Sequence, residues 1–107
     1  MSGIENLAGS AFNDTLTGST GTNVLYGLSG DDTLYGDAGS DALYGDDGND
    51  RLYGGNDADA VYGGNHVDRV YGGNDADTLW GEAGSDSILQ GDAGNDLIYG
   101  GIDADWL

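Results

Sequence analysis

From Gly9 onwards an aliphatic residue returns at every ninth position, inside a fixed order of small and polar side chains. We number the nine positions of a unit as slots, starting from its opening glycine: an acid or amide fills slot six and the aliphatic fills slot eight. Such a period identifies a repeat architecture and takes priority over the interpretation of any single segment. The slot-eight aliphatics are Leu16, Leu25, Leu34, Leu43, Leu52, Val61, Val70, Leu79, Ile88, Ile98 and Leu107.

Each unit predicts one turn and one short strand. The first six residues, Gly-Leu-Ser-Gly-Asp-Asp at 27–32, predict the turn, and Thr33-Leu34-Tyr35 alternates outward, inward and outward as a strand does. Because three residues are too few for a stable isolated strand, each strand must stack on its copies, about 4.8 Å apart. Two units per coil bring strands 18 residues apart into one parallel ladder, with the aliphatics inside. The sequence therefore predicts an all-β solenoid of about five coils over residues 9–107.

One extra residue near Gln90 interrupts the period and stretches the spacing between neighbouring turns from 18 to 19 residues. The sequence leaves open whether Ile88 or Leu89 is the inward residue at this point.

The two ends differ from the repeat. Residues 1–8 fall outside it, and we expect them to form an N-terminal cap in which Ile4 and Leu7 cover the first coil, because solenoids need covered ends. The chain stops at Leu107 beside Trp106, so we expect an uncapped C-terminal end that could stack on a second copy.

The amino-acid composition is strongly acidic. The chain has 20 acidic residues, two arginines, no lysine and a net charge of −18, a balance that usually indicates disorder. Here ten of the acids recur at slot six, and 21 of the 22 glycines recur at slots one, two and four, where a turn needs positive φ or close backbone approach. We therefore infer ordered turns that present ligands to a cation. The charge also argues against nucleic acid as a partner.

The units at 36–44 (GDAGSDALY), 45–53 (GDDGNDRLY) and 91–99 (GDAGNDLIY) come close to the pattern Gly-Gly-x-Gly-x-Asp-x-aliphatic-x. This pattern resembles the calcium-binding nonapeptide of RTX (repeats-in-toxin) proteins, and the resemblance covers residues 9–107. It implies a right-handed parallel β-roll, with calcium between stacked turns and held by loop carbonyls and by slot-six aspartates of two turns. It also implies a secreted bacterial protein that uses the type I secretion machinery.

Carried onto this sequence, the resemblance gives two sets of metal ligands. The carboxylate ligands are Asp14, Asp32, Asp41, Asp50, Asp59, Asp68, Asp77, Asp86, Asp96 and Asp105, and the glycines of the binding turns are Gly30, Gly39, Gly48, Gly55, Gly64, Gly73, Gly84 and Gly94. Asn23 occupies slot six without a charge, so we expect weaker binding between Asn23 and Asp41. Five gaps on one side and four on the other allow at most nine ions.

The chemistry of these residues agrees with calcium, which takes six to eight carboxylate and carbonyl oxygens at about 2.3–2.6 Å. Softer metals are disfavoured because the chain has no cysteine and one histidine, His66. We expect His66 to be a surface loop residue.

The function that follows is a non-enzymatic module, since no nucleophile–histidine pair or phosphate loop is present. Extracellular calcium modules bind with dissociation constants of about 0.1–1 mM, which at millimolar calcium adds roughly 0.4–1.4 kcal/mol per site. We therefore predict a chain that is unfolded without calcium, folds with it, and supports the secretion and folding of a larger protein. The alternative is a module that binds a glycan, a surface, a protein or its own copies. We identify no signal peptide or membrane span.

Aromatic residues occupy slot nine in two series. Tyr26, Tyr44, Tyr62, Trp80 and Tyr99 fall on one side, and Tyr35, Tyr53 and Tyr71 on the other. They either stack along the ladder as structural contacts or form a platform for a ligand.

Five further residues carry expectations of their own. Asp57 and Asp75 replace glycine in slot four and should keep the left-handed turn, or add carboxylate ligands. Phe12, in the same slot, should pack as a cap. Arg51 and Arg69 should pair with nearby acids.

Overall fold

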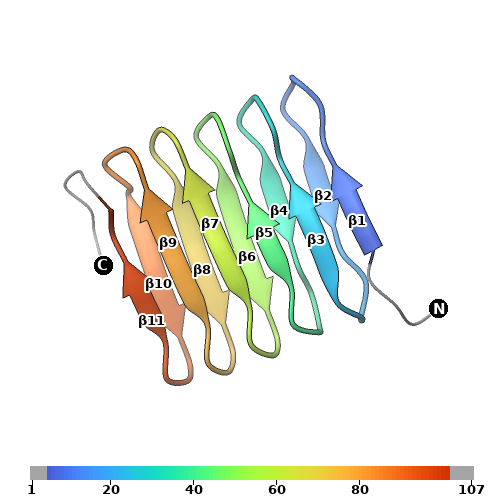
Figure 1. Ribbon diagram of the computed structural model, residues 1–107, viewed down its shortest axis with the longest axis vertical. Coiled ribbons are helices and arrows are strands. Elements are labelled where there is room, and N and C mark those ends of the chain that lie inside the picture. The colour runs from blue at the N-terminus through green and yellow to red at the C-terminus, as the bar shows by residue number, and fades with distance from the viewer. Residues whose placement is uncertain (1–4, 102–107) are drawn as a thin grey trace.

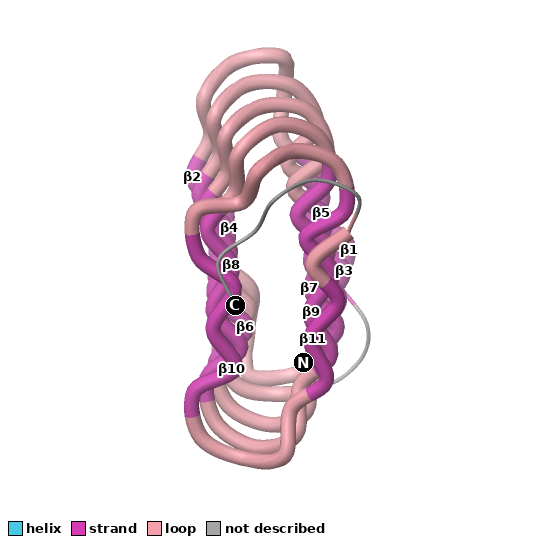
Figure 2. Tube along the Cα trace, turned by 90° about the vertical axis from the view of Figure 1, so that its left-hand side faces the viewer, coloured by secondary structure: helices cyan, strands magenta, loops and turns pink. Residues whose placement is uncertain are grey.

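The computed structural model describes residues 5–101, and within them every regular element is a β-strand. Figure 1 shows the strands stacked side by side, and Figure 2 shows the coil as a flattened tube with one sheet on each long side. One sheet contains β1 (Glu5–Ala8), β3 (Asn23–Tyr26), β5 (Ala42–Tyr44), β7 (Ala60–Gly64), β9 (Thr78–Glu82) and β11 (Leu97–Tyr99). The other contains β2 (Thr15–Thr17), β4 (Thr33–Tyr35), β6 (Arg51–Gly55), β8 (Arg69–Gly73) and β10 (Ile88–Asp92).

All strand pairs are parallel and join equivalent slots of units two apart. Leu25 lies opposite Leu43, and Leu34 opposite Leu52, so the offset is the 18 residues that the period predicts. The alternation of successive strands between the two sheets confirms the all-β solenoid with two units per coil. β6 to β10 continue through slots one and two and are five residues long, because their glycine-containing ends also join the ladder, as Gly55 does with Gly73.

The slot-eight aliphatics fill the space between the sheets. Those with at most 1% of their surface exposed are Leu25, Leu34, Leu43, Leu52, Val61, Val70, Leu79 and Leu89, and Leu7, Leu16 and Ile98 pack against them while partly exposed. Full burial of such a side chain stabilises a fold by about 1.5–3 kcal/mol. Leu107 lies outside the described residues.

The extra residue near Gln90 forms a bulge. Ile88 lies opposite Arg69 in the ladder, yet the N–H of Ser87 donates to Asp68 O at 3.0 Å, the bond that the slot-seven residue makes in other coils. Two residues therefore oppose Arg69, as in a β-bulge. Leu89 pairs with Val70 and is the inward residue, which resolves the ambiguity.

At the N-terminus β1 extends the ladder by one strand. Leu7 lies opposite Leu25 and packs against the core, so residues 5–8 follow the coil although they lack the repeat pattern. Ile4 lies outside the described residues, as do Trp106 and Leu107 at the other end. A capping role for residues 1–8 and an uncapped C-terminal end stay predictions.

From residue 27 onwards the turns use left-handed backbone at slots two and four. Asp57 and Asp75 adopt φ of 72° and 76°, which confirms that they keep the turn that glycine makes elsewhere. At Gly39, a methyl group would lie 2.6 Å from the carbonyl oxygen of Gly21 in the coil before, so the coils approach closely enough here to require glycine.

Phe12 does not pack as a cap. Its side chain is 78% exposed in the first turn. The expectation from the sequence is wrong for this residue.

We predict that Leu43→Ala lowers the free energy of unfolding by about 2–5 kcal/mol in calcium, since it leaves a cavity in the core. The same change at Leu28, which is 41% exposed in a turn, should alter it by less than about 0.5 kcal/mol. Urea denaturation of both variants followed by circular dichroism measures the difference, and equal effects would contradict this account of the core.

Candidate metal centre

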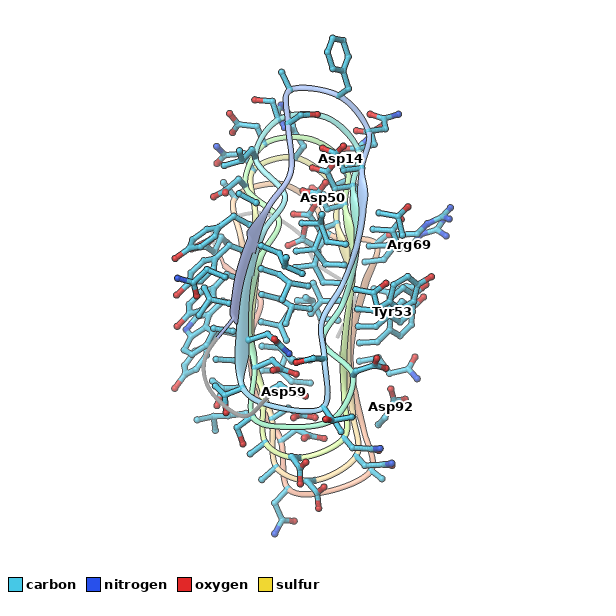
Figure 3. All side chains as sticks on the ribbon, turned by 90° about the vertical axis from the view of Figure 1, so that its right-hand side faces the viewer. Asp14, Asp50, Tyr53, Asp59, Arg69 and Asp92 are labelled. Atoms are coloured by element: carbon cyan, nitrogen blue, oxygen red, sulfur yellow. The ribbon has the colours of Figure 1, made fainter. Side chains whose placement is uncertain are left out.

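The slot-six aspartates form two columns, one at each end of the flattened coil. Figure 3 shows Asp14 and Asp50 in the turns at one end and Asp59 in the turns at the other. Asp32, Asp41, Asp50, Asp59, Asp68, Asp77 and Asp86 are between 0% and 4% exposed, whereas Asp14 and Asp96 at the ends of the columns are partly exposed. Asp105 lies outside the described residues. The fold therefore buries carboxylates that are almost never buried without a partner.

One oxygen of each carboxylate connects successive coils. The N–H of Asp32 donates to Oδ1 of Asp50 at 2.7 Å, and the N–H of Asp50 donates to Oδ1 of Asp68 at 2.8 Å. The other column repeats this bond, with Asp41 N–H donating to Oδ1 of Asp59 at 2.8 Å. This bridge is missing from the sequence prediction, which assigned the aspartates only to metal. The 18-residue period places these groups in register, but it says nothing of which group each oxygen meets.

The second oxygen is buried without a hydrogen-bond partner. This holds for Oδ2 of Asp32, Asp41, Asp50, Asp59, Asp68 and Asp77. A carboxylate oxygen in this position costs several kcal/mol in free energy unless a cation or a donor meets it. Six such atoms in one regular array are candidate ligand positions for a cation.

The slot-one glycine leaves room beside this oxygen. A methyl group on Gly27 would lie 2.8 Å from Oδ2 of Asp32 and 2.8 Å from the carbonyl oxygen of Gly45 in the next coil. The same holds at Gly63, with 2.8 Å to Oδ2 of Asp68 and 2.9 Å to the carbonyl oxygen of Gly81. Carboxylate and carbonyl oxygens of two successive coils therefore converge on the space that a side chain would fill.

Burial away from water raises the pKa of these carboxyls, because the charged form loses its hydration. The pKa rises to about 6 for Asp41 and Asp77, to about 7 for Asp50, and to about 8 for Asp59 and Asp68, and that of Asp32 is also raised. The N–H donated to each Oδ1 opposes this shift, and most of them have further carboxylates nearby that add to it. A cation would reverse the balance by stabilising the ionised form.

The residues present fit calcium. No three histidine, cysteine, aspartate or glutamate side chains in residues 5–101 gather around one point, so a cation here must take much of its coordination from backbone carbonyls. Calcium accepts such mixed oxygen sets, and the bound ion would supply positive charge between turns. The eight glycines predicted for the binding turns, Gly30, Gly39, Gly48, Gly55, Gly64, Gly73, Gly84 and Gly94, all have positive φ in slots two and four.

Side chains in slot four contact the previous coil. Oδ2 of Asp57 accepts the N–H of Gly39 at 2.9 Å, and Oδ2 of Asp75 accepts the N–H of Asp57 at 3.1 Å. Nδ1 of His66 accepts the N–H of Gly48 at 3.0 Å, and His66 is exposed. These groups hold one turn on the next, which supports a structural role for Asp57 and Asp75. No feature of the sequence predicts these bonds.

The slot-nine aromatics form two stacks. Ring centroids are 4.3–5.8 Å apart along Tyr26, Tyr44, Tyr62, Trp80 and Tyr99, with planes within 10° of parallel, and Tyr35, Tyr53 and Tyr71 stack in the same way. The rings cover each other's faces and turn their edges outward. This geometry suits the structural interpretation, while a ligand platform stays a prediction.

Arg51 and Arg69 lie opposite each other on β6 and β8, on the outer face of the sheet. Both side chains are exposed, and neither forms an ion pair within the described part of the chain. The expected pairing with nearby acids is therefore wrong.

A family model described as RTX calcium-binding nonapeptide repeat (4 copies) matches residues 1–34, 8–43, 35–65, 62–89 and 86–107. The chain belongs to this family of calcium-binding repeats. No curated protein matches the chain significantly. Within residues 5–101 there is no helix of the length and apolar character needed to cross a membrane.

We predict that the metal-free fold is most stable in mild acid. The aspartate pKa is 3.8 before burial and about 6–8 in the fold, so the folded state holds more protons in this range. The stability that protonation gives is fully present below pH 3.8 and is lost as the pH rises through 6–8. In excess chelator with enough sucrose to populate the metal-free fold, the urea midpoint should therefore be higher at pH 5 than at pH 8.

Saturating calcium should reverse this order, since calcium binds the ionised carboxylates. A midpoint in chelator that stays constant or rises between pH 5 and pH 8 would contradict the burial of uncompensated aspartates.

Proposed function

We propose that the chain is a calcium-driven folding module, which is unfolded without calcium and forms the solenoid when calcium binds between its turns. The observation that supports this most directly is the array of six buried Oδ2 atoms without hydrogen-bond partners. The family supports calcium as the cation. The oxygen-rich turns, which offer no thiolate ligand because the chain has no cysteine, agree with it.

The balance of forces favours a switch over a permanently stable scaffold. The buried aliphatics and the aromatic stacks stabilise the coil, while ordering each residue costs about 1–2 kcal/mol in backbone entropy. Buried like charges in each column oppose folding further at neutral pH. Several bound ions, each adding roughly 0.4–1.4 kcal/mol at millimolar calcium, would together shift the folding equilibrium towards the solenoid.

We assign the ions to the turns that end at Asp32, Asp41, Asp50, Asp59, Asp68 and Asp77, with slot-six carboxylates and turn carbonyls as ligands. The two columns continue towards the C-terminus with Asp86, Asp96 and Asp105, and we assign calcium ions to their turns as well. The upper limit of nine ions from the sequence remains part of the proposal.

A calcium-dependent fold suits export. Cytosolic calcium is too low to fill sites of millimolar affinity, so the chain would stay extended inside the cell and fold outside, where calcium is abundant. This repeat typically occurs in secreted bacterial proteins, and we propose that the protein that carries this chain is also secreted. Type I secretion and a non-enzymatic role rest on the same resemblance.

A matched pair of variants in one turn tests the site. Asp59→Asn removes a buried carboxylate whose Oδ2 has no partner, and Asp57→Asn makes the same change two residues away at an exposed side chain. We expect Asp59→Asn to bind fewer calcium ions and to need several-fold more calcium for half-maximal folding, with Asp57→Asn close to wild type. Calcium titration followed by circular dichroism and by native mass spectrometry gives both quantities.

Two results would contradict the proposal. One is a wild-type spectrum rich in β-structure that does not change in excess chelator. The other is equal calcium binding by wild type and Asp59→Asn.

A further inference from the structure

We infer that the first two turns, residues 9–14 and 18–23, bind no calcium, because their own side chains occupy the position that a cation takes in later turns. This rests on the proposed function and assigns the first calcium site to the turn at 27–32. Three independent observations carry it: the contacts of Asn23, the contacts of Asp14, and the backbone of both turns.

The amide of Asn23 fills its turn. Its side chain is fully buried, and Nδ2 donates to Ser19 O at 3.2 Å, to Gly21 O at 2.9 Å and to Oδ1 of Asp41 at 3.3 Å. All three acceptors are oxygens, from two carbonyls of the same turn and from the carboxylate of the next coil. These are the kinds of ligand that calcium uses, and here a neutral donor meets them. Only the nitrogen end of the amide suits this position, since an oxygen would face three acceptors.

The carboxylate of Asp14 is satisfied inside its own turn. Its Oδ2 accepts the N–H of Ser10 at 2.6 Å and the hydroxyl of Ser10 at 3.0 Å. In Asp32, one coil later, the equivalent Oδ2 is buried without a partner. The same atom therefore has donors in the first turn and lacks them in the third.

The backbone of these two turns differs from that of the later ones. Leu28, with φ of 71°, and Gly30, with φ of 100°, begin a series of left-handed residues in slots two and four that continues to Gly101. Among the described residues, slots two and four of the first two turns stay outside this series, including Gly21.

Serine in slot two accounts for the difference. Ser10 and Ser19 are the serines found in this slot, and each hydroxyl contacts the slot-six side chain and the slot-four N–H of its own turn. The hydroxyl thus closes the turn from inside.

The consequence is a first coil that needs no metal. β1 can pair with β3 around turns that carry no unmet charge, and the calcium-dependent coils then add to this template. The sequence predicted weaker binding at Asn23, whereas the structure assigns the calcium-free state to both turns.

A reciprocal exchange of turns tests the inference. Ser19→Asp with Asn23→Asp converts GSTGTN at 18–23 into GDTGTD, which matches the GDAGSD of residues 36–41. Asp37→Ser with Asp41→Asn makes the opposite conversion. Native mass spectrometry in saturating calcium should count one ion more than wild type in the first double variant and one ion fewer in the second. In excess chelator with enough sucrose to populate the metal-free fold, the urea midpoint should fall in the first and rise in the second.

The inference is overturned if Ser19→Asp with Asn23→Asp binds the same number of ions as wild type. Should either variant not fold, a diffraction map of calcium-loaded wild type decides: an ion between Ser19 and Asn23, or beside Asp14, overturns it. The proposed function fails separately, if wild type remains folded in chelator, and the ion counts test the first two turns in either case.

Discussion

The structure depends on a carboxylate that is buried with only one of its oxygens bonded. In each column, Oδ1 of slot six accepts the N–H of the equivalent residue one coil earlier and so joins the coils. Oδ2 of the same group stays without a partner in six consecutive turns, from Asp32 to Asp77. The aspartate that holds neighbouring turns together is therefore also the one that we propose as a calcium ligand, which would couple stacking to metal binding.

The remaining interactions set the shape of the coil and supply most of the free energy that offsets the cost of ordering the chain. Eight aliphatics line the inside of the tube with at most 1% exposure, and two aromatic stacks run along its outer faces. Neither contribution offsets the charge in the turns, because both lie on the strands while the carboxylates lie at the two ends of the coil (Figure 3). The strands can pack as soon as the turns are neutralised.

The stack is also asymmetric along its length. In the first turn Ser10 donates a hydrogen bond to Oδ2 of Asp14, and in the second turn the Asn23 amide donates one to the carbonyl oxygen of Gly21. From Asp32 to Asp77, Oδ2 of the slot-six aspartate has no hydrogen-bond partner. A coil without unmet charge at one end would give the coils that we propose to depend on calcium a surface on which to form. This would fix where folding starts in a molecule whose units are otherwise nearly alike, since in repeat arrays each unit is stabilised mainly by its neighbours.

The sequence by itself determined the period, the inward aliphatics, the offset of 18 residues and the column to which each aspartate belongs. These follow from local alternation and from the requirement that identical short strands stack, so they need no knowledge of side-chain contacts. Tertiary structure alone decided which of Ile88 and Leu89 points inward, because the bulge opposite Arg69 depends on the partner strand. It also decided that Phe12 is exposed, that Arg51 and Arg69 stand without acidic partners, and that Ser10 and Asn23 close their turns. The physical reason is the same in each case: a period specifies which residues meet, whereas the direction of each hydrogen bond depends on the three-dimensional path of the turn.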